Sequence, residues 1–421
     1  MSNGVFVEYT NGISDSPVRL RQPRTPPVLL PRSGHISCIY RDDLFTWGGF
    51  RELPGGPIPS DRYLDNHELW IYSIEAESWR METLDGDQLP PGMSGACCAI
   101  SHDTLYVFGG FGREGNSDRL YCLNFRTRKW TLMEPEGDLP SPRDKALSWI
   151  YNNKFYVFGG FGPEPRCKAM FGQWFWDTTT SWAPDRGRGW NNHLFVYDID
   201  TNCWTEQRTI GETPSPRAAH AGDVIGNKLY IFGGRLNQTR INDLYSLNLD
   251  TFQWSEKLEC NSDVPCGRSW HSFTRVTDIH MLLYGGFDTE CKTLGDCWVL
   301  NTQTLIWTQL EQPWRPRLWH TAVSTNVGGE VIIFAGCQNN ILGSEDSDHC
   351  YDLFHIHFTP KSLLRSCMDV VIQYREIMKE HVTLLPRSVL DTLEKRLDAI
   401  VNPPTQLQPG SVESKHSCLI A

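Results

Sequence analysis

Two arginines and one serine are the residues of this sequence whose types and spacing best suit the binding of a small anion. Arg235 directly follows the pair Gly233-Gly234, Arg240 comes five residues later in the same predicted loop, and Ser269 lies further along the chain. A guanidinium offers a bidentate fork to a carboxylate, and a hydroxyl adds a donor. The alternative is that the arginines only pair with loop acids such as Asp243, which needs no functional reason.

An internal repeat of about 50 residues would position these side chains. Gly-Gly pairs end apolar, alternating runs at residues 48–49, 109–110, 159–160, 233–234 and 285–286, with a weakened sixth copy at 335–336. Arg-x-x-His or a remnant of it precedes each copy, and a tryptophan follows the first five copies, at Trp79, Trp130, Trp204, Trp254 and Trp307. Four short strands cannot bury their faces alone, but copies stacked around an axis can, with tryptophans in the wedges.

These features resemble the kelch repeat, and the resemblance covers about residues 30–358. It implies an all-β fold, a six-bladed kelch β-propeller over residues 28–359. The sixth copy lacks its tryptophan strand, and the unassigned strand-like segment is residues 5–9, within an N-terminal segment of residues 1–27. We therefore predict that the N-terminus closes the ring.

In a propeller, the residue after each Gly-Gly pair and the two residues between Arg and His should line one funnel. Most of the residues at these positions are aromatic or small, and the chemically distinctive ones are Phe161, Arg235, Lys145, Ser269, Trp270 and Trp319. An insertion at about residues 162–190 is rich in Trp and Phe and ends in Arg188-Gly189-Trp190. Long loops in compact domains are usually functional or disordered. The aromatic content favours a lid or wall over the funnel.

The composition excludes several classes of function. The chain has 39 Lys and Arg against 50 Asp and Glu, a net charge of −11, which does not favour nucleic-acid binding. No apolar run approaches the roughly 18 residues of a membrane helix, and the N-terminus does not read as a secretory signal. We therefore expect a cytoplasmic or nuclear protein. The 14 cysteines include no Cys-x-x-Cys pair, so we expect no metal site, cofactor or disulfide framework.

The hydrophobic period becomes helical after Ser362, with a break at Leu385-Pro386, so residues 360–400 are predicted to be a short helical segment and residues 401–421 a flexible tail. The first helix resembles the BC box that docks on Elongin B/C, through Leu363, Cys367 and Val371. The second resembles the cullin box of Cullin-2 type adaptors, through Leu385, Pro386, Val389 and Leu393. The bland alternative is that both helices only pack on the propeller.

Over about residues 30–400, the chain resembles the kelch-domain-containing substrate receptors of Cullin-2 type cullin-RING ubiquitin ligases, which recognise C-terminal diglycine degrons. The resemblance implies that Arg235, Arg240 and Ser269 hold the terminal carboxylate of a substrate that ends in glycine. It also implies that aromatic and basic neighbours surround this group, at Trp270, Trp190, Arg188, Trp319 and Lys145. Phe161 departs from the tyrosine that some members have, which removes a hydroxyl.

Other functions remain as alternatives at this point. A propeller enzyme would need a catalytic motif, and the sequence has no HExxH, GxSxG or phosphate loop, so we expect a non-catalytic receptor. A kelch scaffold could instead bind internal peptide loops, with no ligase role.

The final residues, Cys418-Leu419-Ile420-Ala421, fit the C-a-a-X pattern, in which a final alanine favours farnesylation of Cys418. A four-residue match also arises by chance. Because the tail has no basic run and no second nearby cysteine, one prenyl chain would give only weak membrane association.

Overall fold

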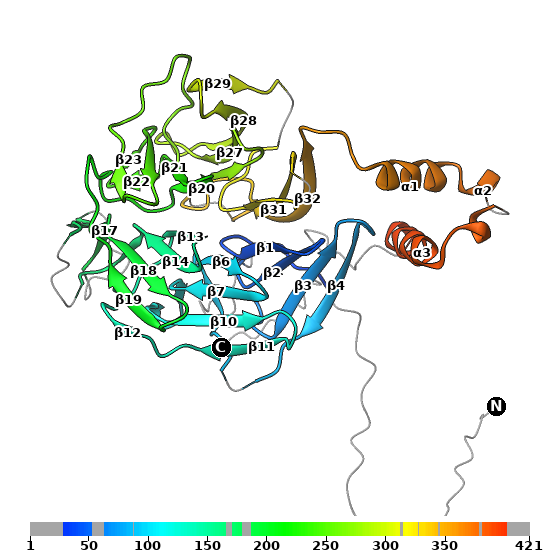
Figure 1. The fold of residues 1–421 in the computed structure, drawn as a ribbon, viewed down its shortest axis with the longest axis horizontal. Helices are drawn as coiled ribbons and strands as arrows, with labels where there is room; N and C mark the ends of the chain where they lie inside the picture. The colour runs from blue at the N-terminus through cyan, green and yellow to red at the C-terminus, as the bar shows by residue number, and fades with distance from the viewer. Residues whose placement is uncertain are drawn as a thin grey trace, which may run out of the picture.

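The computed structural model describes residues 28–52, 63–86, 88–165, 171–178, 187–311, 315–326, 328–343, 346–378 and 381–401. The predicted ring-closing strand at residues 5–9 and the predicted prenylation site, Cys418, lie outside the described residues. Antiparallel strands dominate the described part, and a small group of helices follows them (Figure 1).

Six large sheets follow one another along the chain. The first two contain β1 (Ile36–Tyr40), β2 (Asp43–Trp47), β3 (Glu68–Ser73) and β4 (Ser78–Thr83), then β6 (Cys97–Ser101), β7 (Thr104–Phe108), β10 (Leu120–Asn124) and β11 (Lys129–Leu132). The third contains β13 (Leu147–Tyr151), β14 (Lys154–Phe158), β18 (Leu194–Asp198), β19 (Cys203–Glu206) and the short β12 (Glu136–Gly137). The fourth contains β20 (Ala221–Ile225), β21 (Lys228–Phe232), β24 (Leu244–Asn248) and β25 (Gln253–Trp254).

The fifth large sheet contains β26 (Ser272–Arg275), β27 (His280–Phe287), β28 (Thr293–Asn301) and β29 (Ile306–Gln309). The sixth has three strands among the described residues, β30 (Thr321–Ser324), β31 (Glu330–Cys337) and β32 (His349–His357). Three small sheets lie in the loops, built from β5 (Met93–Ser94), β8 (Phe111–Gly112) and β9 (Gly115–Asn116), from β15 (Phe161–Pro163), β16 (Trp174–Trp176) and β17 (Arg188–Asn191), and from β22 (Arg235–Leu236) and β23 (Thr239–Arg240).

Tight hairpins join the first two strands of the first four sheets. Each uses a two-residue turn whose first residue has a positive φ, namely Arg41, His102, Asn152 and Gly226. Two-residue turns with positive φ match the right-handed twist of the strands that they join. The second strand of each hairpin is buried on both faces and reads as a run of aromatic and branched residues, as in Lys154–Phe158.

The conserved place of the tryptophan in the repeat has a packing reason. The ring of Trp130 lies 5.3 Å from that of Trp47 in the preceding sheet, and Trp204 lies at the same distance from Phe108. Trp79 of the first sheet packs at 4.9 Å against Phe334 of the sixth sheet. The tryptophans therefore fill the wedges between sheets, as predicted, and the last sheet meets the first.

The inner strands confirm this cyclic order. The first strand of each large sheet contacts the first strand of the next, and β30 of the last sheet contacts β1 of the first. One loop of each sheet adds a backbone hydrogen bond to the loop of the preceding sheet. These six bonds run from Gly95 to Gly34, from Lys145 to Gly95, from Ala219 to Lys145, from Trp270 to Ala219, from Trp319 to Trp270 and from Gly34 back to Trp319. The arrangement is consistent with a kelch propeller.

The Arg-x-x-His and Gly-Gly patterns support each other within every intact copy. The buried guanidinium of Arg217 donates to the carbonyl of Gly233 at 3.0 Å and to Asp243 at 2.5 and 2.8 Å. Gly234 has a φ of +103°, and a Cβ there would lie only 2.8 Å from the Cβ of His220. The close approach of the two loops therefore requires glycine at this position.

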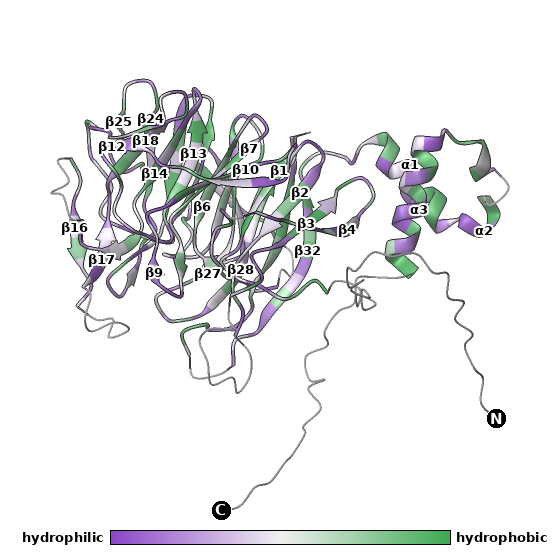
Figure 2. Cartoon of the chain, turned by 90° about the horizontal axis from the view of Figure 1, so that it is seen from below, coloured by the Kyte–Doolittle hydropathy of each residue, from purple (hydrophilic) through white to green (hydrophobic). Residues whose placement is uncertain are grey.

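The helices lie at one edge of the sheets, next to β4 and β32 (Figures 1 and 2). They are α1 (Leu363–Gln373), α2 (Arg375–Met378), the 3₁₀ turn η2 (Val382–Leu384) and α3 (Arg387–Val401). Ser362 caps α1, because its hydroxyl accepts the backbone N–H of Arg365. None of the helices in the described ranges has the length and hydrophobicity that a bilayer crossing requires.

Candidate functional site

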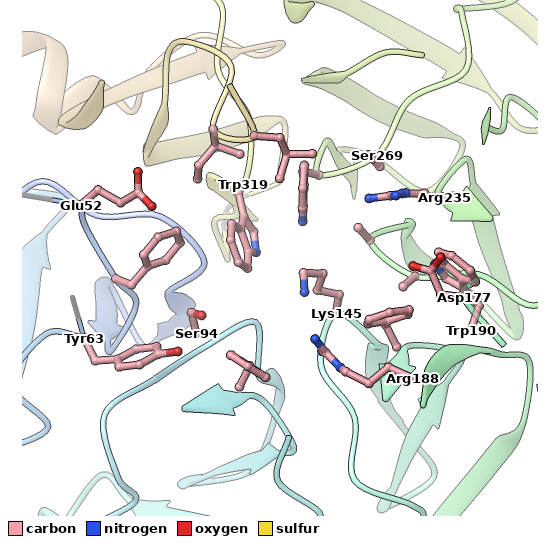
Figure 3. Close-up of a pocket in the computed structure, with 18 residues that line it drawn as sticks. Glu52, Tyr63, Ser94, Lys145, Asp177, Arg188, Trp190, Arg235, Ser269 and Trp319 are labelled. Carbon is pink, nitrogen blue, oxygen red and sulfur yellow. The ribbon is translucent and has the colours of Figure 1, made fainter. Parts of the chain in front are cut away.

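A cavity of about 260 Å³ opens at the centre of the ring of sheets (Figure 3). Its lining contains eight of the nine residues predicted for the ligand site, and these come from four successive sheets: Lys145, Phe161, Arg188, Trp190, Arg235, Ser269, Trp270 and Trp319. Positions that are about 175 residues apart in the sequence thus meet at one mouth. The ninth residue, Arg240, is not part of the lining.

The backbone places these residues by the same pairing in every sheet. The residue after each Gly-Gly pair lies opposite the residue that follows the anchor Arg position, as in Asp144 with Phe161 and Ala218 with Arg235. The funnel predicted from the repeat is therefore largely present. Several of its predicted members do not line the cavity, among them Phe287, Leu318 and Cys337, which are fully buried.

Unusual backbone angles direct the larger side chains into the cavity. Lys145, Trp270 and Trp319 have φ values of +56°, +57° and +53°, at the same position of the repeat where two other copies have glycine. A left-handed conformation costs a non-glycine residue about 1–2 kcal/mol. The ring of backbone hydrogen bonds described above holds these residues in place, and strain of this kind is concentrated at functional sites.

The two arginines of the predicted anion site lie opposite each other on the β22–β23 hairpin. Arg235 Nε donates to the carbonyl of Asn237 at 2.7 Å, and Arg240 donates to the carbonyl of Gln238 at 3.2 Å. Among the described residues, neither guanidinium lies within 4.0 Å of a carboxylate. Asp243, which the alternative hypothesis paired with them, is bound by Arg217 instead.

Several donors at this place have no hydrogen-bond partner within the described part of the chain. They are Arg240 Nε, the Ser269 hydroxyl and the Trp270 indole N–H, all buried. Arg240 packs 5.1 Å above the ring of Phe287, and Phe287 pairs with Ser269, so the donors are close together. Buried donors without acceptors are costly, so a ligand that accepts hydrogen bonds would be stabilised here.

Charge also favours an anion here. Burial lowers the pKa of Arg235, which Asp177 partly counteracts, and burial and the neighbouring Arg235 both lower the pKa of Arg240. Both guanidiniums stay protonated at neutral pH, because arginine is not deprotonated in proteins. An anion between them would relieve both the desolvation and the repulsion.

The aromatic side chains form the walls against which the cations pack. Arg235 lies 5.8 Å from the ring centre of Trp190, and Lys145 lies 5.4 Å from that of Trp319. Trp319 in turn stacks on Trp270 at 5.4 Å. Cation–π contacts of this kind hold a charged group over an apolar wall without neutralising it.

On the third sheet, Asp144 holds two of the predicted basic residues. Its carboxylate pairs with Lys145 and lies 3.4 Å from Arg188. Burial lowers the pKa of Lys145, Asp144 acts in the opposite direction, and Arg188 lowers it further. Lys145 and Arg188 are therefore structural partners of Asp144 as well as members of the cavity wall.

Comparison with known proteins decides the family. The family model described as the KLHDC2/KLHL20/DRC7 Kelch-repeats domain matches residues 34–184 and 180–363. The chain belongs to the kelch-repeat family. Its kelch repeats are thus the source of both the cyclic sheet order and the cavity at its centre.

Relatives resemble this kelch protein over almost their whole length. Kelch domain-containing protein 2 of Bos taurus is 38% identical over 371 residues, which is 87% of this chain and 90% of the relative. Kelch domain-containing protein 1 of Mus musculus is 39% identical over 386 residues, 90% of this chain and 93% of the relative. Kelch domain-containing protein 10 of Xenopus laevis is more distant, at 26% identity over 368 residues.

Some lining residues do not follow from the kelch repeat. They are Asp177 in the insertion of the third sheet, Glu52 and Tyr63 between β2 and β3 of the first sheet, and Ile341 and Leu342 between β31 and β32 of the sixth. All of them lie in connecting loops, where the repeat gives no register. The aromatic content of residues 162–190 predicted a wall at this place, but nothing in the sequence singled out Asp177.

The residues predicted for partner docking lie apart from the cavity, on the helices. Leu363 and Cys367 are exposed on α1, while Val371 is partly buried. Pro386 is exposed before α3, Leu385 and Val389 are partly buried, and Leu393 is only 2% exposed. The structure therefore leaves the first half of the predicted docking stripe open and buries its last member within the helical segment.

A possible metal-binding group near the helices is already engaged. Ligand atoms of Glu330, His355 and His357 lie within 4.8 Å of one another. Arg365 of α1 donates to both carboxylate oxygens of Glu330, at 2.8 and 2.9 Å. A cation would have to compete with this guanidinium, so we assign no metal or cofactor to these residues.

Proposed function

We propose that this protein is the substrate-recognition subunit of a cullin-RING ubiquitin ligase and binds substrates through their C-terminal carboxylates. The observation that carries the proposal is the group of buried donors without acceptors at Arg240, Ser269 and Trp270, beside the guanidinium of Arg235. In this proposal the six large sheets are the blades of one closed propeller, and the ligand enters its central cavity.

The charge balance at the cavity favours one carboxylate over a phosphate. Three cationic and two acidic side chains line the cavity, namely Lys145, Arg188 and Arg235 with Glu52 and Asp177. The excess of one positive charge matches a single carboxylate. A phosphate monoester carries about −1.5 to −2 at neutral pH and would leave a buried negative excess.

The walls favour glycine at the end of the bound peptide. The ring centres of Trp190 and Phe161 are 5.0 Å apart, and Trp270 stacks on Trp319. Rigid rings therefore lie on both sides of the proposed carboxylate site. Rigid rings that leave little room for a Cβ select glycine near the carboxylate. Substrate C-termini that end in one or two glycines are therefore the ligand class that we propose.

The helical segment serves as the docking element for the rest of the ligase. Leu363, 80% exposed, and the exposed Cys367 present an apolar stripe on α1 that suits Elongin B/C, with a Cullin-2 type scaffold beside it. The receptor itself performs no chemistry, and the other subunits transfer ubiquitin. We place this activity in the cytoplasm or nucleus, with weak membrane association only if Cys418 is prenylated.

A peptide titration tests the binding site. A peptide of about ten residues ending in Gly-Gly should bind, and its C-terminally amidated copy should lose about a hundredfold in affinity, because the charge that pairs with the arginines is gone. Fluorescence polarisation with labelled peptides measures both. Equal binding of the two peptides would rule out the carboxylate site.

A co-purification experiment tests the ligase role. Elongin B/C should co-purify with the wild-type protein and should be lost in Leu363→Asp, because a charge in the exposed stripe opposes an apolar contact. The matched control is Ile306→Asp, which places the same charge at an exposed apolar position on a sheet. Peptide binding without any Elongin B/C would favour a kelch scaffold instead.

A further inference from the structure

An aromatic row leads out of the cavity across the small sheet of the insertion. In this sheet β17 lies between β15 and β16. Phe161 of β15 and Phe175 of β16 both pair with Trp190 of β17, so the three aromatic side chains share one face of the sheet. Phe161 and Trp190 are buried in the cavity wall, whereas Phe175 is 48% exposed.

The face that carries Phe175 is the face of the cavity. Asp177 follows Phe175 by two positions and lines the cavity, and side chains two apart in an extended segment point to the same side. Trp174 and Trp176 belong to the opposite face, since the Trp174 indole donates to the carbonyl of Gly162 and the Trp176 ring lies over Gly187. Trp176 is 62% exposed there.

We propose that Phe175 forms an outer subsite, which binds an apolar side chain of the same substrate peptide upstream of its C-terminal glycines. The inference rests on the proposed function, since the carboxylate on Arg235 defines where the peptide ends. Arg235 packs over Trp190, so the terminal residues lie at that ring. Neighbouring strands are about 4.8 Å apart, which is about one and a half residues of an extended peptide that rises about 3.3 Å per residue, so with the two glycines at Trp190, Phe175 meets about the third or fourth residue from the end.

The aromatic row favours this side of the cavity over the side that carries Glu52 for the upstream part of the peptide. Glu52, in a loop of the first sheet, lies across the cavity from Trp190 (Figure 3), and the exposed Leu342, in a loop of the sixth sheet, also lines the cavity. That side begins away from the arginine hairpin, with no register that links it to Trp190. The aromatic row, in contrast, begins at Trp190 beside Arg235 and ends at the exposed Phe175, so it offers apolar surface to a side chain of the peptide.

A series of peptides, measured against the wild-type protein and three protein variants, tests this subsite. The peptides end in Gly-Gly and carry either leucine or serine at the third, fourth or fifth residue from the end, and a short Gly-Gly peptide without these residues serves as reference. We expect leucine to raise the affinity of the wild-type protein about tenfold over serine at one of these positions. In the Phe175→Ala variant, the ratio of the leucine affinity to the serine affinity should fall to about one, and binding of the short peptide should be unchanged.

The matched control is Trp176→Ala, which removes an exposed aromatic ring from the same strand but from the other face, and should keep the leucine preference. Loss of the preference in Leu342→Ala instead of Phe175→Ala would overturn the assignment, and so would the absence of any leucine preference in the wild-type protein. Failure of the short peptide to bind would overturn the carboxylate site itself, and the subsite with it. Binding of the short peptide with an unchanged ratio in Phe175→Ala would overturn the subsite alone.

Discussion

Arginine side chains at two places in this molecule are buried to the same degree but are paired differently. Arg240 at the cavity and Arg365 at the base of α1 are each 6% exposed. Arg365 donates to both oxygens of Glu330, whereas Arg240 donates to one backbone carbonyl and packs over Phe287. The junction of helices and sheets therefore has its counter-charge built in, whereas Arg235 and Arg240 at the cavity have no carboxylate within 4.0 Å among the described residues.

The network at the junction extends over both helices. Arg396 of α3 pairs with Glu77 and lies 3.0 Å from Asp369 of α1, so each helix is bound both to the other helix and to a sheet. Such pairs hold geometry more than they add stability, because their desolvation offsets much of their attraction. The buried charges at the junction therefore fix a position, whereas in the proposed function Arg235 and Arg240 at the cavity bind an anion.

The largest expected effect comes from breaking the junction. Arg365→Met leaves the buried carboxylate of Glu330 without its guanidinium, which should lower the stability of the docked helices by about 3–5 kcal/mol. Hydrogen exchange across residues 363–401, together with thermal unfolding, measures it. The double variant Glu330→Gln with Arg365→Met should recover part of the loss. Peptide affinity should not change, and a parallel loss of affinity would contradict the separation of the two regions.

At the mouth, removal of an arginine should affect binding and not stability. Arg240→Ala should lower the affinity for a Gly-Gly peptide about a hundredfold, because the carboxylate loses a charge-assisted partner in a desolvated site. Thermal stability should stay the same or rise, since Arg235 and Arg240 repel each other in the free protein. Arg240→Lys, which keeps the charge without the fork, should lie between the two. A loss of thermal stability in Arg240→Ala would instead show that Arg240 has a structural role, like Arg365 at the junction.

The junction and the cavity should respond to opposite changes in pH. The stability of the docked helices should fall in acid, whereas the affinity for the peptide should fall in alkali. Burial acts to raise the pKa of Glu330, but hydrogen bonds from His355 and Arg365 outweigh it and lower the pKa from 4.5 to about 2. A lowered carboxyl pKa contributes stability that is present above pH 4.5 and is lost as pH falls toward 2. Hydrogen exchange in α1 should therefore accelerate in this acid range, and Glu330→Gln should remove that acceleration.

The smallest expected effect is a loss of peptide affinity at high pH, caused by deprotonation of Lys145 at the cavity. Burial lowers the pKa of Lys145 below 10.5, so its charge is lost as pH rises toward that value. Peptide affinity should then fall by about threefold, a size typical of one partly paired charge. Peptide titrations at a series of increasing pH values measure this decrease in affinity. The Lys145→Met variant should bind the peptide more weakly at neutral pH, and its affinity should not decrease further at high pH. A decrease of equal size in this variant would assign the effect elsewhere.

The kelch repeat and most of the mouth were predictable because they depend on short patterns. Gly-Gly, Arg-x-x-His and the tryptophan recur at fixed places, and each has a local packing reason, as the contact of Gly234 with His220 shows. Once these patterns define the register, the mouth residues follow by position, as with Arg235 opposite Ala218. Asp177 escaped prediction because the insertion interrupts the register.

The sequence by itself determined the repeating sheets, the family and many of the positions that line the cavity, since period and spacing are properties of the chain alone. Only the tertiary structure decided which charges are paired. Asp243 was a plausible partner for Arg235 by proximity, but it binds Arg217, and Glu330 meets Arg365 across 35 residues. Which charged side chains pair depends on where distant loops meet and on how far water is excluded there. The spacing of residues along the chain predicts neither of these.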